Sequence, residues 1–81
     1  MNDKYNLAMD LKRVCSWILQ GSDELVNQVL DRDIKLYSKL KVKIGKIKVM
    51  DLLVMIKDRQ DGDTAAAERA LTAAAILLSK Y

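Results

Sequence analysis

The chain has 81 residues, of which 51% are hydrophobic and 31% charged, with no proline, no phenylalanine and three glycines. This length indicates one domain, residues 1–81, and the shortage of proline and glycine favours helices over a loop-rich fold. The longest apolar runs, 52–56 and 73–78, are far shorter than the roughly 18 residues of a membrane span. Cys15 is the only cysteine, and nothing at the N-terminus resembles an export signal, so we expect a cytoplasmic protein without disulfides.

Charge is unevenly distributed along the chain. The formal net charge is +3, but the basic segment from Lys35 to Lys48 carries six lysines and no acid. The rest of the chain holds eight basic and eleven acidic residues, a balance of −3. One basic segment therefore sits in an otherwise mildly acidic protein.

The first predicted helix covers about 3–20. Apolar residues at helical spacing give it a buried stripe of Leu7, Leu11, Val14, Cys15 and Ile18. Gly21 follows directly and is placed to end the helix in a left-handed C-cap conformation.

The second predicted helix begins after Ser22, a preferred N-cap residue. Its inner face is predicted to consist of Val26, Val29, Leu30, Tyr37 and Leu40. Asp33 interrupts this face, and two interpretations are open. We favour a helix that ends near Asp31, with Asp33 capping a new turn. The alternative is a buried carboxylate paired with Arg32 or a lysine, because an unpaired buried charge is costly.

The last part of the basic segment alternates lysine and apolar residues around Gly45-Lys46. This alternation predicts extended structure over 41–49, either a connector or a tiny β-hairpin with a two-residue turn. A hairpin would place Lys43 opposite Lys48, where like charges repel. The segment also fits a helix, because its apolar residues recur at helical spacing at Leu36, Leu40, Ile44 and Ile47. Continuation of the second helix is therefore the less favoured alternative.

Two more helices are predicted after this segment. The third covers about 49–60, with an inner stripe of Val49, Leu52, Leu53 and Ile56. A turn signal at 61–63 precedes the fourth helix, which Asp63 or Thr64 should cap and which runs nearly to Tyr81. Its inner stripe is predicted to be Ala67, Ala70, Leu71, Ala74, Leu77 and Leu78. These alanines allow close approach, so we expect this helix to be central in an all-α, compact four-helix domain, either orthogonal or bundle-like.

Motifs for catalysis and cofactor binding are missing from the sequence. There is no histidine to serve as an acid or base, and one cysteine is too few for a zinc site. The three glycines are isolated from one another, so no phosphate-binding loop is present. We therefore expect no enzyme, no cofactor, no metal site and no small-molecule substrate.

Apolar residues away from the predicted inner faces are the first candidates for a functional surface. They are Trp17, Val54, Met55 and Ile76. Tryptophan is enriched at binding hot spots, which favours burial of these residues in a homodimer or against a partner protein. The plainer interpretations are a tryptophan at the edge of the core, a third helix covered on several sides and a single exposed isoleucine.

Lysines of the basic segment are the second candidates, for contacts to nucleic-acid phosphates. They are Lys39, Lys41, Lys43, Lys46 and Lys48. The plainer interpretation is a solvated face, because lysines protect exposed strand edges from unwanted pairing. The segment also lacks arginine for bidentate phosphate contacts and has only Tyr37 nearby for base stacking.

The sequence thus predicts a small cytoplasmic helical module that acts by protein–protein association, as a homodimer, regulatory subunit or adaptor. The alternative is a nucleic-acid-binding accessory protein that uses the basic segment on backbone phosphates. Salt-sensitive binding to nonspecific DNA or RNA would favour the alternative.

Overall fold

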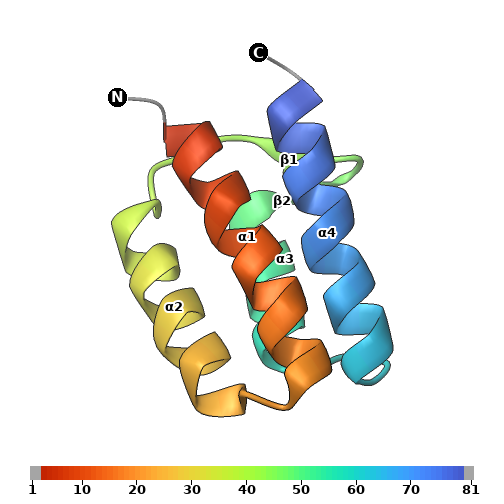
Figure 1. Ribbon diagram of the computed structural model, residues 1–81. Coiled ribbons are helices and arrows are strands. Elements are labelled where there is room, and N and C mark those ends of the chain that lie inside the picture. The colour runs from red at the N-terminus through yellow and green to blue at the C-terminus, as the bar shows by residue number, and fades with distance from the viewer. Residues whose placement is uncertain (1–2, 80–81) are drawn as a thin grey trace.

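The computed structural model describes residues 3–79, which form four helices and a two-stranded hairpin (Figure 1). The helices are α1 (Asp3–Gln20), α2 (Asp23–Leu36), α3 (Val49–Lys57) and α4 (Asp63–Ser79). The antiparallel strands are β1 (Lys43–Ile44) and β2 (Ile47–Lys48). The all-α prediction is confirmed, and the connector forms the tiny hairpin rather than an extension of the second helix.

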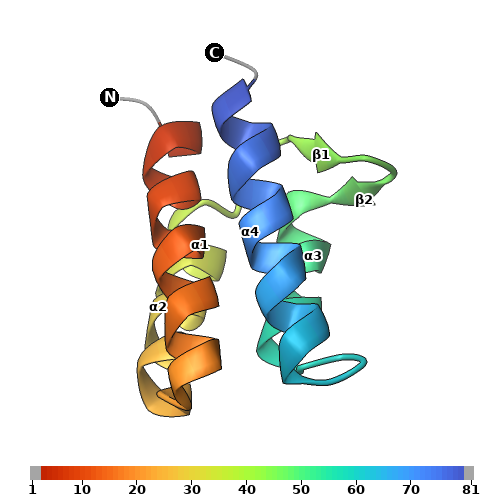
Figure 2. The same cartoon turned by 45° about the vertical axis from the view of Figure 1, so that its right-hand side comes forward.

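The helices form an up-and-down bundle in which successive helices run antiparallel (Figures 1 and 2). Within residues 3–79, α1 packs against α2 and α4, and α3 packs against the same two helices. The bundle therefore has two distinct ends. The loop end carries the α1–α2 loop and residues 58–62 between α3 and α4. The hairpin end carries residues 37–48, together with the start of α1 and the last turns of α4 (Figure 2).

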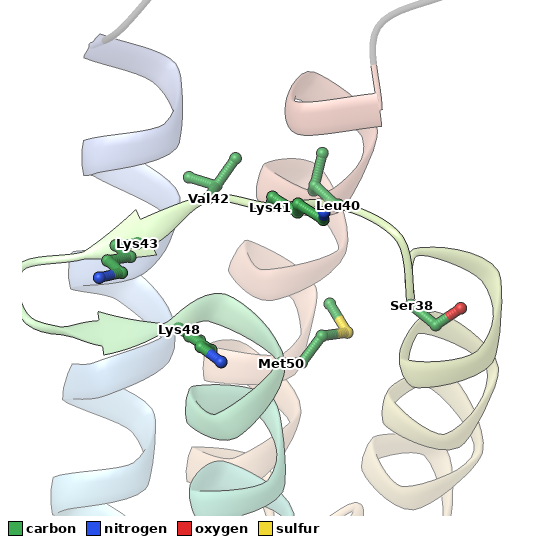
Figure 3. A pocket seen from close by; sticks show the side chains of 7 residues that line it. All are labelled: Ser38, Leu40, Lys41, Val42, Lys43, Lys48 and Met50. Carbon is green, nitrogen blue, oxygen red and sulfur yellow. The ribbon is translucent and has the colours of Figure 1, made fainter.

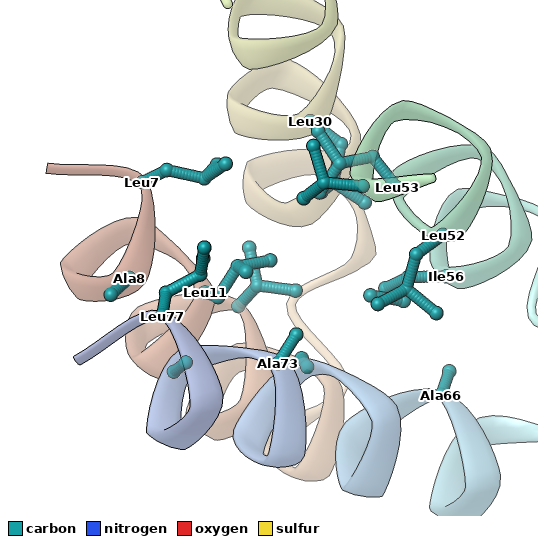
Figure 4. Packing of buried hydrophobic residues seen from close by; sticks show 14 of the residues in the cluster. Leu7, Ala8, Leu11, Leu30, Leu52, Leu53, Ile56, Ala66, Ala73 and Leu77 are labelled. Atoms are coloured by element: carbon teal, nitrogen blue, oxygen red, sulfur yellow. The ribbon is translucent and has the colours of Figure 1, made fainter. Parts of the chain in front are cut away.

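The hydrophobic core lies between the four helices and receives side chains from each of them (Figure 4). Among the fully buried residues are Leu7, Leu11, Leu30, Leu53, Ile56, Ala70 and Ala74. The inner stripe predicted for the third helix is buried throughout. The α1–α4 contact is the most extensive helix pair, because small alanine side chains let two helix axes approach closely.

The predicted inner face of the fourth helix needs correction. Leu71 was expected inside, but it is 52% exposed, and Ala66 and Ala73 are fully buried instead. The buried stripe of α4 is thus rotated toward its alanines, which fit the narrow space beside α1, and Leu71 falls outside that space. α4 is also not surrounded: its neighbours in the described structure are α1, α3 and the hairpin.

The ends of the helices follow from local backbone conformation. Gly21 adopts a left-handed φ of +77°, as predicted, and the N–H of Ser22 donates to the carbonyl of Trp17 at 2.8 Å. Ser22 precedes α2, but its side chain makes no capping hydrogen bond. α3 ends at Lys57, earlier than predicted, and the positive φ of Arg59 (+53°) shows that the chain has left the helix there.

Asp33 corrects the interpretation that we favoured from the sequence. α2 does not break near Asp31 but continues to Leu36, and Asp33 is fully buried inside it. Arg32 Nε donates to Asp33 Oδ1 at 3.3 Å, so the alternative of a buried, Arg32-paired carboxyl is the one that the structure shows. The N–H of Tyr37 donates to the carbonyl of Asp33 at 2.9 Å, so the helical hydrogen-bond pattern continues past this acid.

Candidate partner-binding site

The five candidate lysines lie together on the connector and hairpin between α2 and α3. Lys39 and Lys41 precede β1, Lys43 belongs to β1, Lys46 lies in the turn and Lys48 ends β2. All five are exposed. The structure therefore gathers them at the hairpin end of the bundle.

The five candidate lysines and the arginines differ in whether they form ion pairs. Within residues 3–79, none of the five lysines makes an ion pair, whereas each of the chain's four arginines pairs with an aspartate. The paired arginines are Arg13, Arg32, Arg59 and Arg69. The arginines are thus used within the fold, and the lysines leave their charge available to solvent or to a partner.

The hairpin separates its lysines from its isoleucines. Lys43 is opposite Lys48, and Ile44 is opposite Ile47. Since successive side chains of a strand point to opposite faces, the lysine pair occupies one face of the hairpin and the isoleucine pair the other. Each face borders a different hollow of the surface.

A pocket of about 540 Å³ opens beside the lysine face (Figure 3). Its apolar wall comes from Leu40, Val42 and Met50, and Ser38 also lines it. Lys41, Lys43 and Lys48 complete the lining. Figure 3 shows the side chain of Met50 reaching from the first turn of α3 toward the connector. This lysine-rimmed pocket combines positive charge with apolar surface.

The isoleucine face of the hairpin lies over α3 and α4. Ile44 and Ile47 share a shallow hollow with Leu52 of α3 and Thr72 of α4. Ile76 follows Thr72 by one helical turn, so it is on the same side of α4 and closer to the hairpin end. It is partly buried there.

The four apolar candidates do not form one surface. Trp17 and Met55 are partly buried and pack against the core, while Val54 is 44% exposed on α3. Trp17 lies near the C-terminal end of α1 and Ile76 near that of α4. Because these helices are antiparallel, the two residues lie at opposite ends of the bundle.

A polar cluster of two buried aspartates and two exposed arginines joins α1 to α2. Arg32 donates to Asp10 Oδ2 at 2.8 Å and also to Asp33, and Arg13 donates to Asp10 Oδ1 at 3.2 Å. Asp33 Oδ2 has no hydrogen-bond partner among the described residues. Burial, reinforced by neighbouring Asp10, raises the pKa of Asp33 to about 7, although Arg32 acts in the opposite direction. Asp33 therefore holds a proton for part of the time at neutral pH.

Sequence reasoning found the lysines but not the pocket. The sequence predicts Leu40 on the inner face of the second helix, and no sequence pattern points to Met50. Both line the pocket with Val42. The alternating pattern indicated that the segment is extended. No pattern in the sequence, however, indicated that the connector passes close to the first turn of α3.

No known family model matches this chain, and comparisons with curated proteins and with solved structures also found no match. Residues 3–79 contain no group of three or more side chains suited to hold a metal ion. None of the helices in that part of the chain has the length and apolar character needed to cross a membrane.

Proposed function

We propose that this protein is a protein–protein interaction module whose lysine-rimmed pocket binds an acidic partner segment that also carries apolar side chains. The proposal rests on one observation: three lysines that make no ion pair among the described residues line the same pocket as the apolar wall of Leu40, Val42 and Met50. Such a module would act in the cytoplasm as an adaptor or regulatory subunit.

The two parts of the pocket would serve different purposes. Exposed ion pairs contribute about 0–1 kcal/mol each, so the three lysines together contribute up to about 3 kcal/mol, and they also steer an acidic partner and select its orientation. Burying one leucine-sized side chain is worth roughly 1.5–3 kcal/mol. The apolar wall and the lysines are therefore expected to contribute comparable shares of the affinity, and binding needs both.

The apolar wall also favours a protein over a nucleic acid. Contacts to backbone phosphates need positive charge and gain nothing from Val42 or Met50. Single-stranded nucleic acids additionally need exposed aromatic side chains for stacking. Tyr37 is only 7% exposed, and Trp17 lies at the far end of α1. Nucleic-acid binding remains the outcome that would replace this proposal.

Fluorescence anisotropy with three labelled probes tests the proposal. The probes are a peptide of alternating aspartate and leucine, a peptide of equal charge with serine in place of leucine, and a single-stranded DNA. We expect the leucine peptide to bind at least about tenfold more tightly than the serine peptide, a difference of about 1.4 kcal/mol. Met50→Ser should remove most of this preference.

Charge variants complete the design. Lys41→Gln, Lys43→Gln and Lys48→Gln combined should abolish peptide binding, while Lys12→Gln, a change of an exposed lysine on α1, should leave it unchanged. DNA binding as tight as that of the leucine peptide, together with indifference to Met50→Ser, would contradict the proposal and support the nucleic-acid alternative.

A further inference from the structure

The loop end of the bundle carries charge opposite to that of the hairpin end. Its exposed acids are Asp23, Glu24, Asp58, Asp61 and Asp63. Arg59 and Arg69 pair with three of them, and Glu24 and Asp58 have no ion pair within the described residues. The two ends of one molecule are therefore acidic and basic.

The acidic end also exposes large apolar side chains. Leu19 is 67% exposed in the last turn of α1, and Leu25 is 44% exposed in the first turn of α2. Only Gly21 and Ser22 separate the two helices, so both leucines belong to one corner of the bundle. This α1–α2 corner, residues 19–25, places two leucines next to Asp23 and Glu24.

The corner has the chemistry that we propose for the partner of the lysine-rimmed pocket, an acidic segment with exposed leucines. The corner and the pocket of one molecule lie at opposite ends of a bundle whose longest extent is 30 Å, so they cannot meet. A second copy can bring its corner to the pocket. A symmetric pocket-to-pocket dimer would instead oppose two sets of unpaired lysines, which repel one another.

We infer that the α1–α2 corner of one copy docks into the lysine-rimmed pocket of a second copy. This inference rests on the proposed function and names its partner as the same protein. The contact is head-to-tail, so each pair retains one free corner and one free pocket. Such heterologous contacts grow into a ring when the rotation between copies closes and into a filament when it does not.

Two variants that each lose one half of the contact provide the test. The pocket variant combines Lys41→Gln, Lys43→Gln and Lys48→Gln. The corner variant combines Leu19→Ser, Glu24→Gln and Leu25→Ser, which leaves the ion pair between Asp23 and Arg59 in place. Circular dichroism checks that both retain wild-type helix content, and Leu25→Ser alone replaces the corner variant if helix content falls.

Sedimentation velocity at about 50 mM salt, where surface charges are weakly screened, measures the assemblies. The wild type should form dimers and larger species that dissociate as salt rises to about 0.5 M. Each variant alone should be monomeric. Their mixture should form a complex of one copy of each and nothing larger, because the pocket variant still has its corner and the corner variant still has its pocket.

A mixture that stays monomeric, or variants that associate like the wild type, would overturn the inference. A wild type that is monomeric yet binds the acidic leucine peptide would also overturn it, while leaving the proposed function intact. If the wild type neither associates nor binds that peptide, both the inference and the proposed function are wrong.

Discussion

Lys43 and Lys48 face each other directly across the hairpin, with no acid in the intervening chain or anywhere in residues 34–50. Like charges at directly opposed positions destabilise an antiparallel pair. A threonine or an acid at either position would favour the hairpin more. The lysine pair thus destabilises the hairpin. Such a cost is consistent with lysines that bind an acidic partner.

Charge reversal across the hairpin should be stabilising when it is made on one strand. Lys43→Glu or Lys48→Glu alone turns repulsion into attraction and should raise the free energy of unfolding in urea by about 0.2–1 kcal/mol. The double variant restores a like-charged pair and should return to the wild-type value. Further stabilisation in the double variant would show that the two lysines do not interact.

Asp33→Asn should change how stability depends on pH. The pKa of Asp33 is about 7 in the folded protein and about 3.9 in an unfolded chain. Its protonated form therefore contributes stability that is fully present below about pH 4 and lost as the pH rises to about 7. Asparagine resembles the protonated carboxyl, so the stability of the variant should not fall over this pH range. Above pH 7 its free energy of unfolding should exceed that of the wild type by at least about 1 kcal/mol.

Urea unfolding at several pH values measures this difference cleanly, because the chain has no histidine to titrate in the same range. Asp31→Asn, at an exposed position on the same helix, is the control. It removes an ion pair with Lys57, so its stability should differ from that of the wild type by a constant amount above about pH 5. If the difference between Asp33→Asn and the wild type stays constant from pH 4 to 8, the account of a proton held by buried Asp33 is wrong.

Ala74→Leu should disturb the close contact between α1 and α4. Ala74 is fully buried, and inserting a larger side chain into a packed core costs about 1–3 kcal/mol. Ala75→Leu is the matched control, because the neighbouring alanine is exposed and should change stability by less than about 0.5 kcal/mol. Equal melting temperatures for both variants would mean that α1 and α4 are not closely packed.

Trp17→Ala should reduce the stability of the monomer. Trp17 packs partly buried against the core, so its truncation should cost about 2 kcal/mol, less than for a fully buried tryptophan. Val54→Ser, at an exposed position, should cost less than about 0.5 kcal/mol. A Trp17→Ala variant that keeps its stability but loses self-association would instead support the sequence-based hypothesis of a partner anchor.

The end of α1 was predictable from the C-cap glycine Gly21, and the buried stripe of α3 from periodicity, because both depend on local sequence alone. The hairpin followed from alternation around Gly45-Lys46. Asp33 was misjudged because the side chain that bonds it, Arg32, also reaches Asp10 on another helix, and such a tertiary cluster is not visible in local spacing. Leu71 was misjudged because the separation of helices decides which side of α4 is buried.

Only the charge of the candidate site was predictable from the sequence. A run of lysines without acids is visible in the sequence, and so are the acids and leucines near Gly21. Which of these segments share an end of the bundle depends on the directions of the helices. The apolar wall, with Met50 from α3, depends on the path of the connector.

The location of partner binding can be measured from the backbone amide chemical shifts of the isotope-labelled protein as the acidic leucine peptide is added. We expect saturable shifts concentrated in residues 38–50, which contain every residue that lines the lysine-rimmed pocket. The shifts should disappear in the variant with Lys41→Gln, Lys43→Gln and Lys48→Gln. Shifts concentrated on the outer faces of α1 and α4, with residues 38–50 unchanged, would contradict the account.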